Sequence, residues 1–187
     1  MIHYLDKLWN KLMLKIKKVN YQPDILITGR IFIHGVKNGI TMGNHVTIHS
    51  SENVNPTSGI SHSHLRTEGN GKIVIGNNVG MSHVNITAFE GVYIEDNVLL
   101  GSGVKIWDSD FHSIYYNQRV ENNGIKCAAI TIKEGAFIGA CSIILKGVTI
   151  GRHSVVGAGS VVTNNIPEEE VWAGNPAVFI KKLETSL

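Results

Sequence analysis

The chain of 187 residues lacks most features of disulfide-stabilised, membrane-spanning and nucleic-acid-binding proteins. It has two cysteines, Cys127 and Cys141, and no closely spaced pair that would hold zinc. Its net charge of +2 is too small to indicate a nucleic-acid partner. No unbroken apolar stretch is long enough for a transmembrane helix or a secretory signal. These absences predict a reduced, cytoplasmic protein that binds no nucleic acid.

Aromatic residues are also scarce, at 7%, whereas the chain has 20 glycines and many Ile and Val residues. This composition favours short strands joined by tight corners. Residues 1–20 differ, because apolar residues recur there at helical spacing with lysines between them. We therefore expect two parts, an amphipathic helix over 1–20 and a β domain over 21–187. We interpret the helix as packing on the β domain or on a neighbouring subunit, with peripheral membrane contact as the alternative.

An internal repeat of six residues is the strongest signal in the sequence. Neither an α-helix nor an ordinary long strand has this period, but a coil of three short flat faces does. Stacked coils bury one another, and each inward Ile or Val contributes roughly 1.5–3 kcal/mol. The fold class is therefore mainly β, a parallel β-helix. The same phase occurs at Ile94, Leu100 and Ile106. The clearest inward series is Ile132, Ile138, Ile144, Ile150, Val156 and Val162, with mostly small partners at Ala136, Ser142, Val148, Ser154, Ser160 and Ile166.

One long break interrupts this repeat. The segment between Ile106 and Ile132 reads WDSDFHSIYYNQRVENNGIKCAA and lacks the six-residue pattern. We expect a loop at about residues 107–130 that leaves the coil. Loops that project from a rigid scaffold are common sites of binding and catalysis.

The run AITIKEGAFIGACSIILKGVTIGRHSVVGAGSVVTNNIP, followed by VWAGNPAVFIKKL, resembles the C-terminal half of the hexapeptide-repeat acyltransferases. The nearest group comprises the maltose, galactoside and nodulation-factor O-acetyltransferases and their polysaccharide-biosynthesis relatives. The resemblance implies a left-handed β-helix and a homotrimer with acetyl-CoA sites between subunits. It also implies acetyl transfer to a hydroxyl of a sugar, a nucleotide sugar or a polysaccharide precursor. No metal is expected.

His112, in DSDFHSI, lies where these O-acetyltransferases carry their catalytic histidine. A hydroxyl is un-ionised at neutral pH, so the reaction needs a base that titrates near the working pH, and imidazole meets that need. We predict that His112 is the general base and that Asp108 or Asp110 orients it. The spacing does not choose between the two carboxylates. The alternative for His112 is a surface histidine on a loop.

Acceptor-binding residues are expected in MSHVNIT. The galactoside-type enzymes carry an asparagine near this position that contacts the acceptor hydroxyl. A one-residue gap leaves the equivalent open among Ser82, His83 and Asn85. Trp107 is a further candidate, because its ring would either stack on a sugar or pack against the coil. His62 and His64 lie in a Gly- and Ser-rich insertion and would either border the acceptor pocket or be exposed.

The CoA site is expected on a surface of small residues, because the pantetheine arm needs close access to backbone groups. The alternative is that these residues only form corners and inward positions. The resemblance adds Asn175 and Lys181, with Lys181 where relatives have a phosphate-contacting arginine and Val178 where they often have a second one. We expect Cys141 to be a small packed residue. The small-residue candidates are Gly139, Ala140, Gly157, Ala158, Gly159 and Ser160.

Three other interpretations compete. A non-catalytic β-helix scaffold would keep the repeats without needing the loop histidine or the small-residue surface. A γ-class carbonic anhydrase shares the β-helix but needs three histidines on zinc, and no pair here has that family's spacing. An amine in place of a hydroxyl would require similar base chemistry. The identity of the acceptor does not follow from the sequence.

Overall fold

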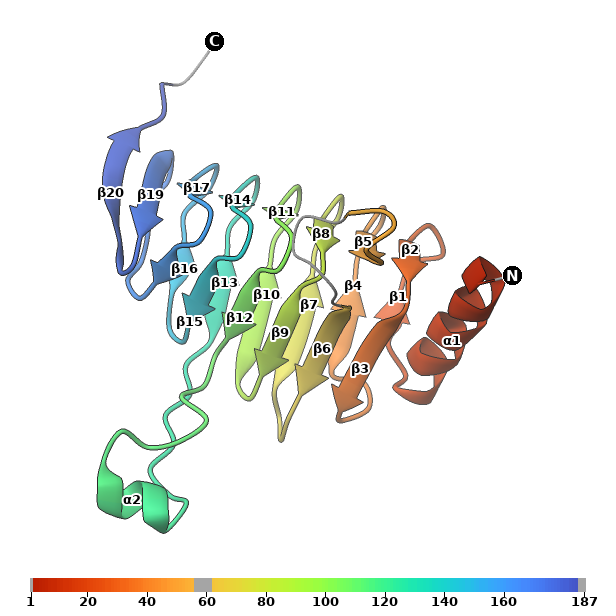
Figure 1. The fold of residues 1–187 in the computed structure, drawn as a ribbon, viewed down its shortest axis with the longest axis horizontal. Coiled ribbons are helices and arrows are strands. Elements are labelled where there is room, and N and C mark those ends of the chain that lie inside the picture. Colours follow the sequence, from red (N-terminus) through yellow and green to blue (C-terminus); the bar gives the residue numbers. More distant parts are fainter. Residues whose placement is uncertain (1, 56–61, 185–187) are drawn as a thin grey trace.

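The computed structural model describes residues 2–55 and 62–184, with side chains from residue 4. Three-sided coils stack along one axis, with a helix at one end and a two-stranded hairpin at the other (Figure 1). Each coil contributes a short strand to each of three sheets, here named sheets A, B and C. Neighbouring strands pair in parallel, as a β-helix requires, except in the hairpin.

The described part of the chain forms the following strands. Sheet A contains β1 (Asn20–Tyr21), β4 (Ile40–Met42), β7 (Lys72–Ile75), β10 (Gly91–Ile94), β13 (Ile130–Ile132) and β16 (Thr149–Ile150). Sheet B contains β2 (Leu26–Gly29), β5 (Thr47–Ser50), β8 (Gly80–Ser82), β11 (Leu99–Leu100), β14 (Phe137–Ile138), β17 (Val155–Val156), β19 (Glu170–Gly174) and β20 (Ala177–Lys182). Sheet C contains β3 (Ile31–Gly35), β6 (Ser63–Thr67), β9 (Asn85–Ala88), β12 (Lys105–Trp107), β15 (Ile143–Leu145) and β18 (Val161–Val162).

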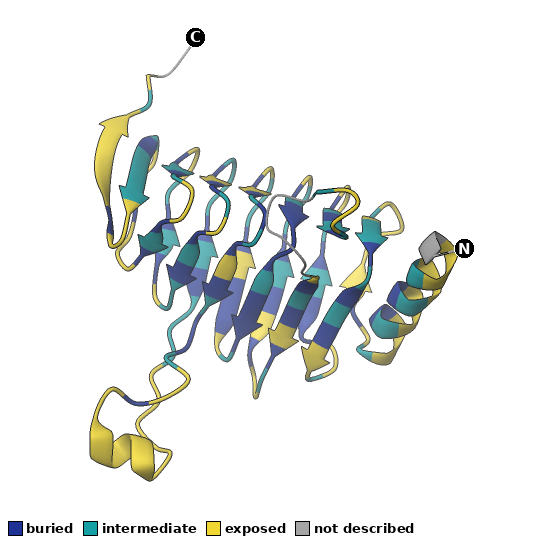
Figure 2. Ribbon diagram, in the orientation of Figure 1, coloured by how far each residue is buried: buried dark blue, intermediate teal, exposed yellow. Residues whose placement is uncertain are grey.

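The core confirms the predicted repeat. The six inward aliphatic residues between Ile132 and Val162 are at most 1% exposed. Their small partners are buried too, from Ala136 at 0% to Ile166 at 2%. Figure 2 shows this as a buried interior that runs the length of the coil. The six-residue phase therefore identifies which side chains point into the prism.

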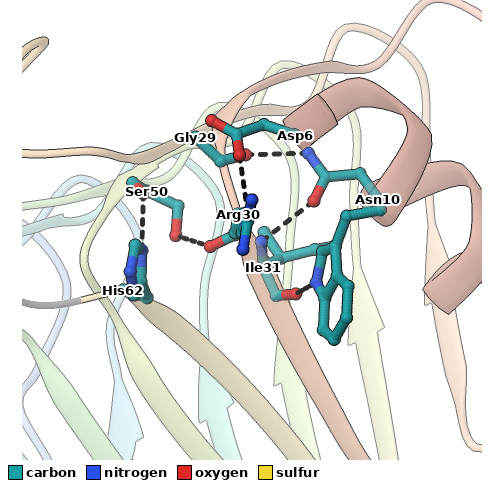
Figure 3. A network of polar contacts seen from close by, with 8 residues as sticks. Asp6, Asn10, Gly29, Arg30, Ile31, Ser50 and His62 are labelled. Carbon is teal, nitrogen blue, oxygen red and sulfur yellow. Dashed lines mark hydrogen bonds and ion pairs between the residues drawn. The ribbon is translucent and has the colours of Figure 1, made fainter. Parts of the chain in front are cut away.

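The N-terminal helix α1 (Ile2–Ile16) is shorter than the predicted 1–20, because Asn20 already begins β1. It covers the open end of the first coil, where the edge strands of the sheets would otherwise leave backbone N–H and C=O groups unpaired. The Asn10 amide donates to the Gly29 carbonyl at 2.8 Å and accepts from the Ile31 N–H at 3.0 Å (Figure 3). Trp9 Nε1 donates to the Ile31 carbonyl at 2.9 Å. One face of α1 is therefore an end cap.

A second apolar face of α1 stays exposed. Leu5, Leu8, Leu12 and Ile16 are 45–57% exposed. Packing on the β-helix therefore accounts for one of the two apolar faces of α1. Within the residues described, neither α1 nor α2 (Tyr116–Val120) is long and apolar enough to cross a bilayer.

Candidate active site

Residues 108–129 leave the coil between β12 and β13, as predicted, and carry α2 (Figure 1). The base of this excursion is a narrow two-stranded stalk. Ser109 and Cys127 form an antiparallel bridge, and the Asp110 N–H donates to the Lys126 carbonyl at 3.0 Å. The loop is thus held at its base by backbone pairing, while His112 lies beyond the stalk and is exposed.

Asp108 anchors the loop to the preceding coil. Its side chain is fully buried and accepts backbone N–H bonds from Phe89, Glu90 and Gly91 at 2.8–3.0 Å. Both carboxylate oxygens are therefore occupied by the corner at residues 89–91. This contact gives Asp108 a structural role, and no hydrogen bond joins it to His112 within the described residues.

Asp110 forms an ion pair with Lys146. Its carboxylate accepts from Lys146 Nζ at 2.6 Å, and its backbone carbonyl accepts the His112 N–H at 2.7 Å. No atom of the described residues meets the His112 ring in hydrogen-bond geometry. In the single chain, then, neither aspartate orients the imidazole. The catalytic roles of His112, Asp108 and Asp110 stay predictions.

The predicted acceptor residues Trp107 and Asn85 contact each other. Trp107 Nε1 donates to Asn85 Oδ1 at 3.0 Å. The Phe111 ring packs edge-on against both Trp107 and Phe89, with ring centroids 5.9 Å apart in each pair. This aromatic cluster connects sheet C to the base of the histidine loop. Asn85 Oδ1 accepts this one bond, whereas its Nδ2 donor makes no hydrogen bond with the described residues.

Beside this cluster, sheet C carries a groove of about 280 Å³. His64, Asn85 and Lys105 occupy register-matched outward positions on β6, β9 and β12. The His64 ring stacks on Phe32 at 5.1 Å. Lys105 was not among the residues predicted from the sequence, although it precedes the inward Ile106 and so points outward. The lining residues are His62, His64, His83, Asn85, Gly103, Lys105 and Cys141.

His83 lies at the corner that leads into β9 and is 3% exposed. Its Nδ1 lies 3.1 Å from Ser102 Oγ, and its buried Nε2 has no hydrogen-bond partner among the described residues. Burial lowers the pKa of His83, and repulsion from His62 lowers it further. The hydrogen-bonding influence of the Ser51 backbone raises it. Ser82, in contrast, is buried and accepts from Asn55 Nδ2 at 3.1 Å.

The corners between sheets B and C stack into a column that links the groove to the predicted CoA residues. Cys141 N donates to the Ser102 carbonyl at 2.8 Å, and Gly159 N donates to the Ala140 carbonyl at 2.8 Å. Cys141 lies at φ +60° and is exposed, so the expectation of a packed residue was wrong. The corner turns its side chain outward to border the groove.

The predicted CoA residues divide into two groups. A side chain on Gly139 would come within 2.5 Å of Ala158 N, and one on Gly157 within 2.7 Å of Ala173 Cβ, so coil packing explains both glycines. Ser160 is buried and donates to the Gly157 carbonyl at 2.6 Å.

The other predicted residues are accessible. Ala158 and Gly159 are exposed and Ala140 is partly exposed. No acceptor in the described part of the chain meets the N–H of Ala140 or Ala158. Asn175 and Lys181 are exposed on the terminal hairpin. The CoA assignments themselves stay predictions.

Comparison with known proteins places the chain among repeat-containing transferases. Residues 129–164 match the family model for bacterial transferase hexapeptide (six repeats). The putative lipopolysaccharide biosynthesis O-acetyl transferase WbbJ of Escherichia coli (strain K12) is 33% identical over 172 residues, which are 85% of each protein. The putative acetyltransferase YJL218W of Saccharomyces cerevisiae is 40% identical over 114 residues, covering 59% of this chain and 56% of that protein.

Other matches share less of their length or only the fold. Gamma carbonic anhydrase 2 of Arabidopsis thaliana is 33% identical over 102 residues, covering 53% of this chain and 37% of that protein. A crystal structure of AntD, an N-acyltransferase from Bacillus cereus, has a TM-score of 0.72 at 21% identity and covers 93% of this chain and 89% of AntD. That structure contains coenzyme A and a dTDP-linked amino sugar.

The chain spans 37–56% of the first curated relatives it matches. The WbbJ match, by contrast, runs over most of both proteins. Together with the matched repeats and the parallel three-sheet coil, it establishes the architecture as the left-handed parallel β-helix predicted from the sequence. The chain therefore belongs to the hexapeptide-repeat acyltransferase family.

Proposed function

We propose that this protein transfers an acetyl group from acetyl-CoA to a hydroxyl of a sugar, a nucleotide sugar or a polysaccharide precursor, with His112 as general base. The observation that carries the proposal is the excursion of the coil at residues 108–129, which presents an exposed imidazole beyond a well-anchored stalk. Family membership supports acyl transfer, and the WbbJ relative supports oxygen as the acceptor atom. The free thiols of Cys127 and Cys141 support action in the cytoplasm.

In this mechanism His112 takes the proton of the acceptor hydroxyl as its oxygen attacks the thioester carbonyl. The imidazolium then returns a proton to the departing sulfur. Bound acetyl-CoA supplies the activated acyl group. The free N–H groups of Ala140 and Ala158 are positioned to bind an amide carbonyl of the pantetheine arm or the oxyanion of the transition state.

The topology supports active sites shared between subunits of a homotrimer. The groove lies where the sheet C strands begin, whereas the loop leaves at the end of β12. The three residues of β12 span about 10 Å, and the stalk then carries His112 outward. The loop of one subunit and the groove of its neighbour would together provide a base and an acceptor site.

The decisive experiment measures CoA release with a panel of sugar acceptors. His112→Ala should lose about 10²–10⁴-fold in kcat because the base is removed. His153→Ala is the matched control, since His153 is an exposed histidine at a corner outside the proposed site. If His112→Ala keeps more than a tenth of the wild-type rate, His112 is not the base. If the protein neither binds acetyl-CoA nor releases CoA, it is a scaffold.

A zinc hydratase is the second candidate, because a gamma carbonic anhydrase is among the relatives. In the described residues no three or more His, Cys, Asp or Glu side chains are grouped so as to hold a metal ion. Metal analysis with a CO₂ hydration assay separates the two functions. Stoichiometric zinc with hydration activity would replace acyl transfer as the function.

A further inference from the structure

The groove on sheet C offers a ligand mainly hydrogen-bond donors. Asn85 Oδ1 already accepts one hydrogen bond from Trp107 Nε1, whereas the Nδ2 donor makes no hydrogen bond with the described residues. Lys105 carries an ammonium, which only donates. No carboxylate is among the described residues that line the groove. A complementary ligand therefore supplies acceptor oxygens and negative charge.

His83 adds a second, independent observation. It is 3% exposed and lines the groove, and its Nε2 makes no hydrogen bond of good geometry within the described residues, although the Ser51 backbone lies close enough to raise its pKa. A buried polar atom without a protein partner is destabilising unless water, an ion or a ligand satisfies it. The Nδ1 contact with Ser102 Oγ holds the ring in place. The site is thus built around a fixed imidazole.

Charged and titratable neighbours surround the two groove histidines. His62, His49 and the Glu52 carboxylate act on His83, and the Glu52 charge favours its protonated form. His34 and His62 act on His64. Burial and these like-charged neighbours lower the pKa of both His64 and His83, so both rings are neutral near pH 7. A bound anion would favour their protonation and strengthen its own binding at lower pH.

We propose that this groove binds a carboxylate or a phosphate group of the acceptor, held by Lys105, Asn85 and His83. The proposal rests on the proposed acetyl transfer and names its substrate class, an acidic sugar or a sugar phosphate. The anionic group would fix the orientation of the sugar, and a free hydroxyl on the same molecule would then meet His112 of the neighbouring subunit.

Calorimetric titration of the full chain without acetyl-CoA tests the site. The probes are glucuronic acid, glucose 1-phosphate and neutral methyl glucoside, so that the first two separate a carboxylate from a phosphate. One of the two anions should bind at least about tenfold more tightly than the neutral sugar. Lys105→Gln should remove most of that preference, and Lys133→Gln should keep it, since Lys133 follows β13 and pairs with Glu95 away from the groove. Equal binding of all three sugars, or of none, overturns the proposal.

The histidine contribution is tested with glucuronic acid, whose carboxylate stays ionised between pH 6 and pH 8. Wild-type affinity should rise as the pH falls, and His83→Asn should flatten this dependence. Asn tolerates the positive φ of +49° at this corner, and circular dichroism checks that the variant folds. A wild-type affinity that does not change with pH removes His83 from the site.

CoA release, measured separately, distinguishes the two proposals. Anion binding without acetyl transfer to any acceptor would refute the proposed function and keep the site. Acetyl transfer to neutral sugars, with no preference for anions, would refute the site and keep the function.

Discussion

The corners that join sheets A and B form one edge of the prism, the A–B edge, and the corners that join sheets B and C form another, the B–C edge. The two edges use the same turn for different purposes. At most corners of these two edges one residue adopts positive φ, for example His153 at +55° between sheets A and B and Gly159 at +71° between sheets B and C. The residue before it is Asn or a charged residue on the A–B edge and, from β8 onward, Ser or Ala on the B–C edge. The A–B residues are Asn44, Asn77, Asp96, Glu134, Arg152 and Glu168, and the B–C residues are Ser82, Ser102, Ala140 and Ala158.

The difference extends to the backbone. On the A–B edge the N–H of Asn77 donates to Asp96 Oδ1 at 2.7 Å, and the N–H of Asn44 donates to Asn77 Oδ1 at 2.9 Å. On the B–C edge the N–H groups of Ala140 and Ala158 meet no acceptor in the described chain. Within the described chain the N–H groups of Asp96, Arg152 and Glu168 meet no acceptor either, so side chains of the A–B edge satisfy only part of its backbone, whereas no side chain does so for Ala140 or Ala158 on the B–C edge.

The largest effect is expected when a charged residue, typical of the A–B edge, replaces a small residue of the B–C edge. Ala158→Glu should weaken acetyl-CoA binding by about 100-fold, because the carboxylate would fill the surface and repel phosphates. The free energy of unfolding should change by less than about 0.5 kcal/mol, since the position is exposed. Calorimetry and denaturant titration measure the two quantities.

Glu168→Ala makes the reverse change on the A–B edge and is the matched control for affinity. It should leave acetyl-CoA binding unchanged. An unaltered affinity in Ala158→Glu would show that the B–C edge is not the CoA surface, and the comparison between the edges would lose its functional meaning.

The corner at residues 89–91, between sheets C and A, differs from both edges. Its backbone N–H groups donate to a carboxylate that comes from the loop. Asp108→Ala would leave the N–H groups of Phe89, Glu90 and Gly91 without their acceptor in a buried site. We expect a loss of about 2 kcal/mol in the free energy of unfolding, measured by denaturant titration. Asp110→Ala removes only a partly exposed ion pair with Lys146 and should cost less than about 1 kcal/mol.

The same pair of variants separates anchoring from catalysis. If Asp110→Ala lowers kcat with little effect on stability, Asp110 orients His112 in the assembled site. If Asp108→Ala is as stable as the wild type, the four backbone contacts at residues 89–91 do not anchor the loop.

The repeat and the loop could be predicted from the sequence because both depend on local phase. Every sixth residue from Ile132 to Val162 is inward, and the break after Ile106 is visible as lost periodicity. The groove is different, since it joins His64, Asn85 and Lys105 across strands separated by insertions of unequal length. Their register cannot be counted from the sequence. The partners of Asp108 and Asp110 likewise depend on how the stalk folds back.

The smallest expected effect tests the A–B edge through its pH dependence. Hydrogen bonds from the side chain and the backbone of Asn77 lower the pKa of Asp96. Because the folded-state pKa is below the unfolded one, Asp96 stabilises the fold above its usual pKa. That contribution is lost as the pH falls through the lower folded-state value. Asp96→Ala should therefore cost less than about 1 kcal/mol at pH 7, since the site is partly exposed, and the difference from wild type should shrink near pH 2.

Thermal unfolding at both pH values, with Glu184→Ala as a control that lacks described contacts, measures this difference. A cost that stays the same at pH 2 would show that the ionised carboxylate of Asp96 does not stabilise the A–B edge. In that case side-chain polarity at this corner would reflect only exposure to water. The small residues on the exposed B–C edge would then depart from that rule, and ligand binding would be the explanation for them.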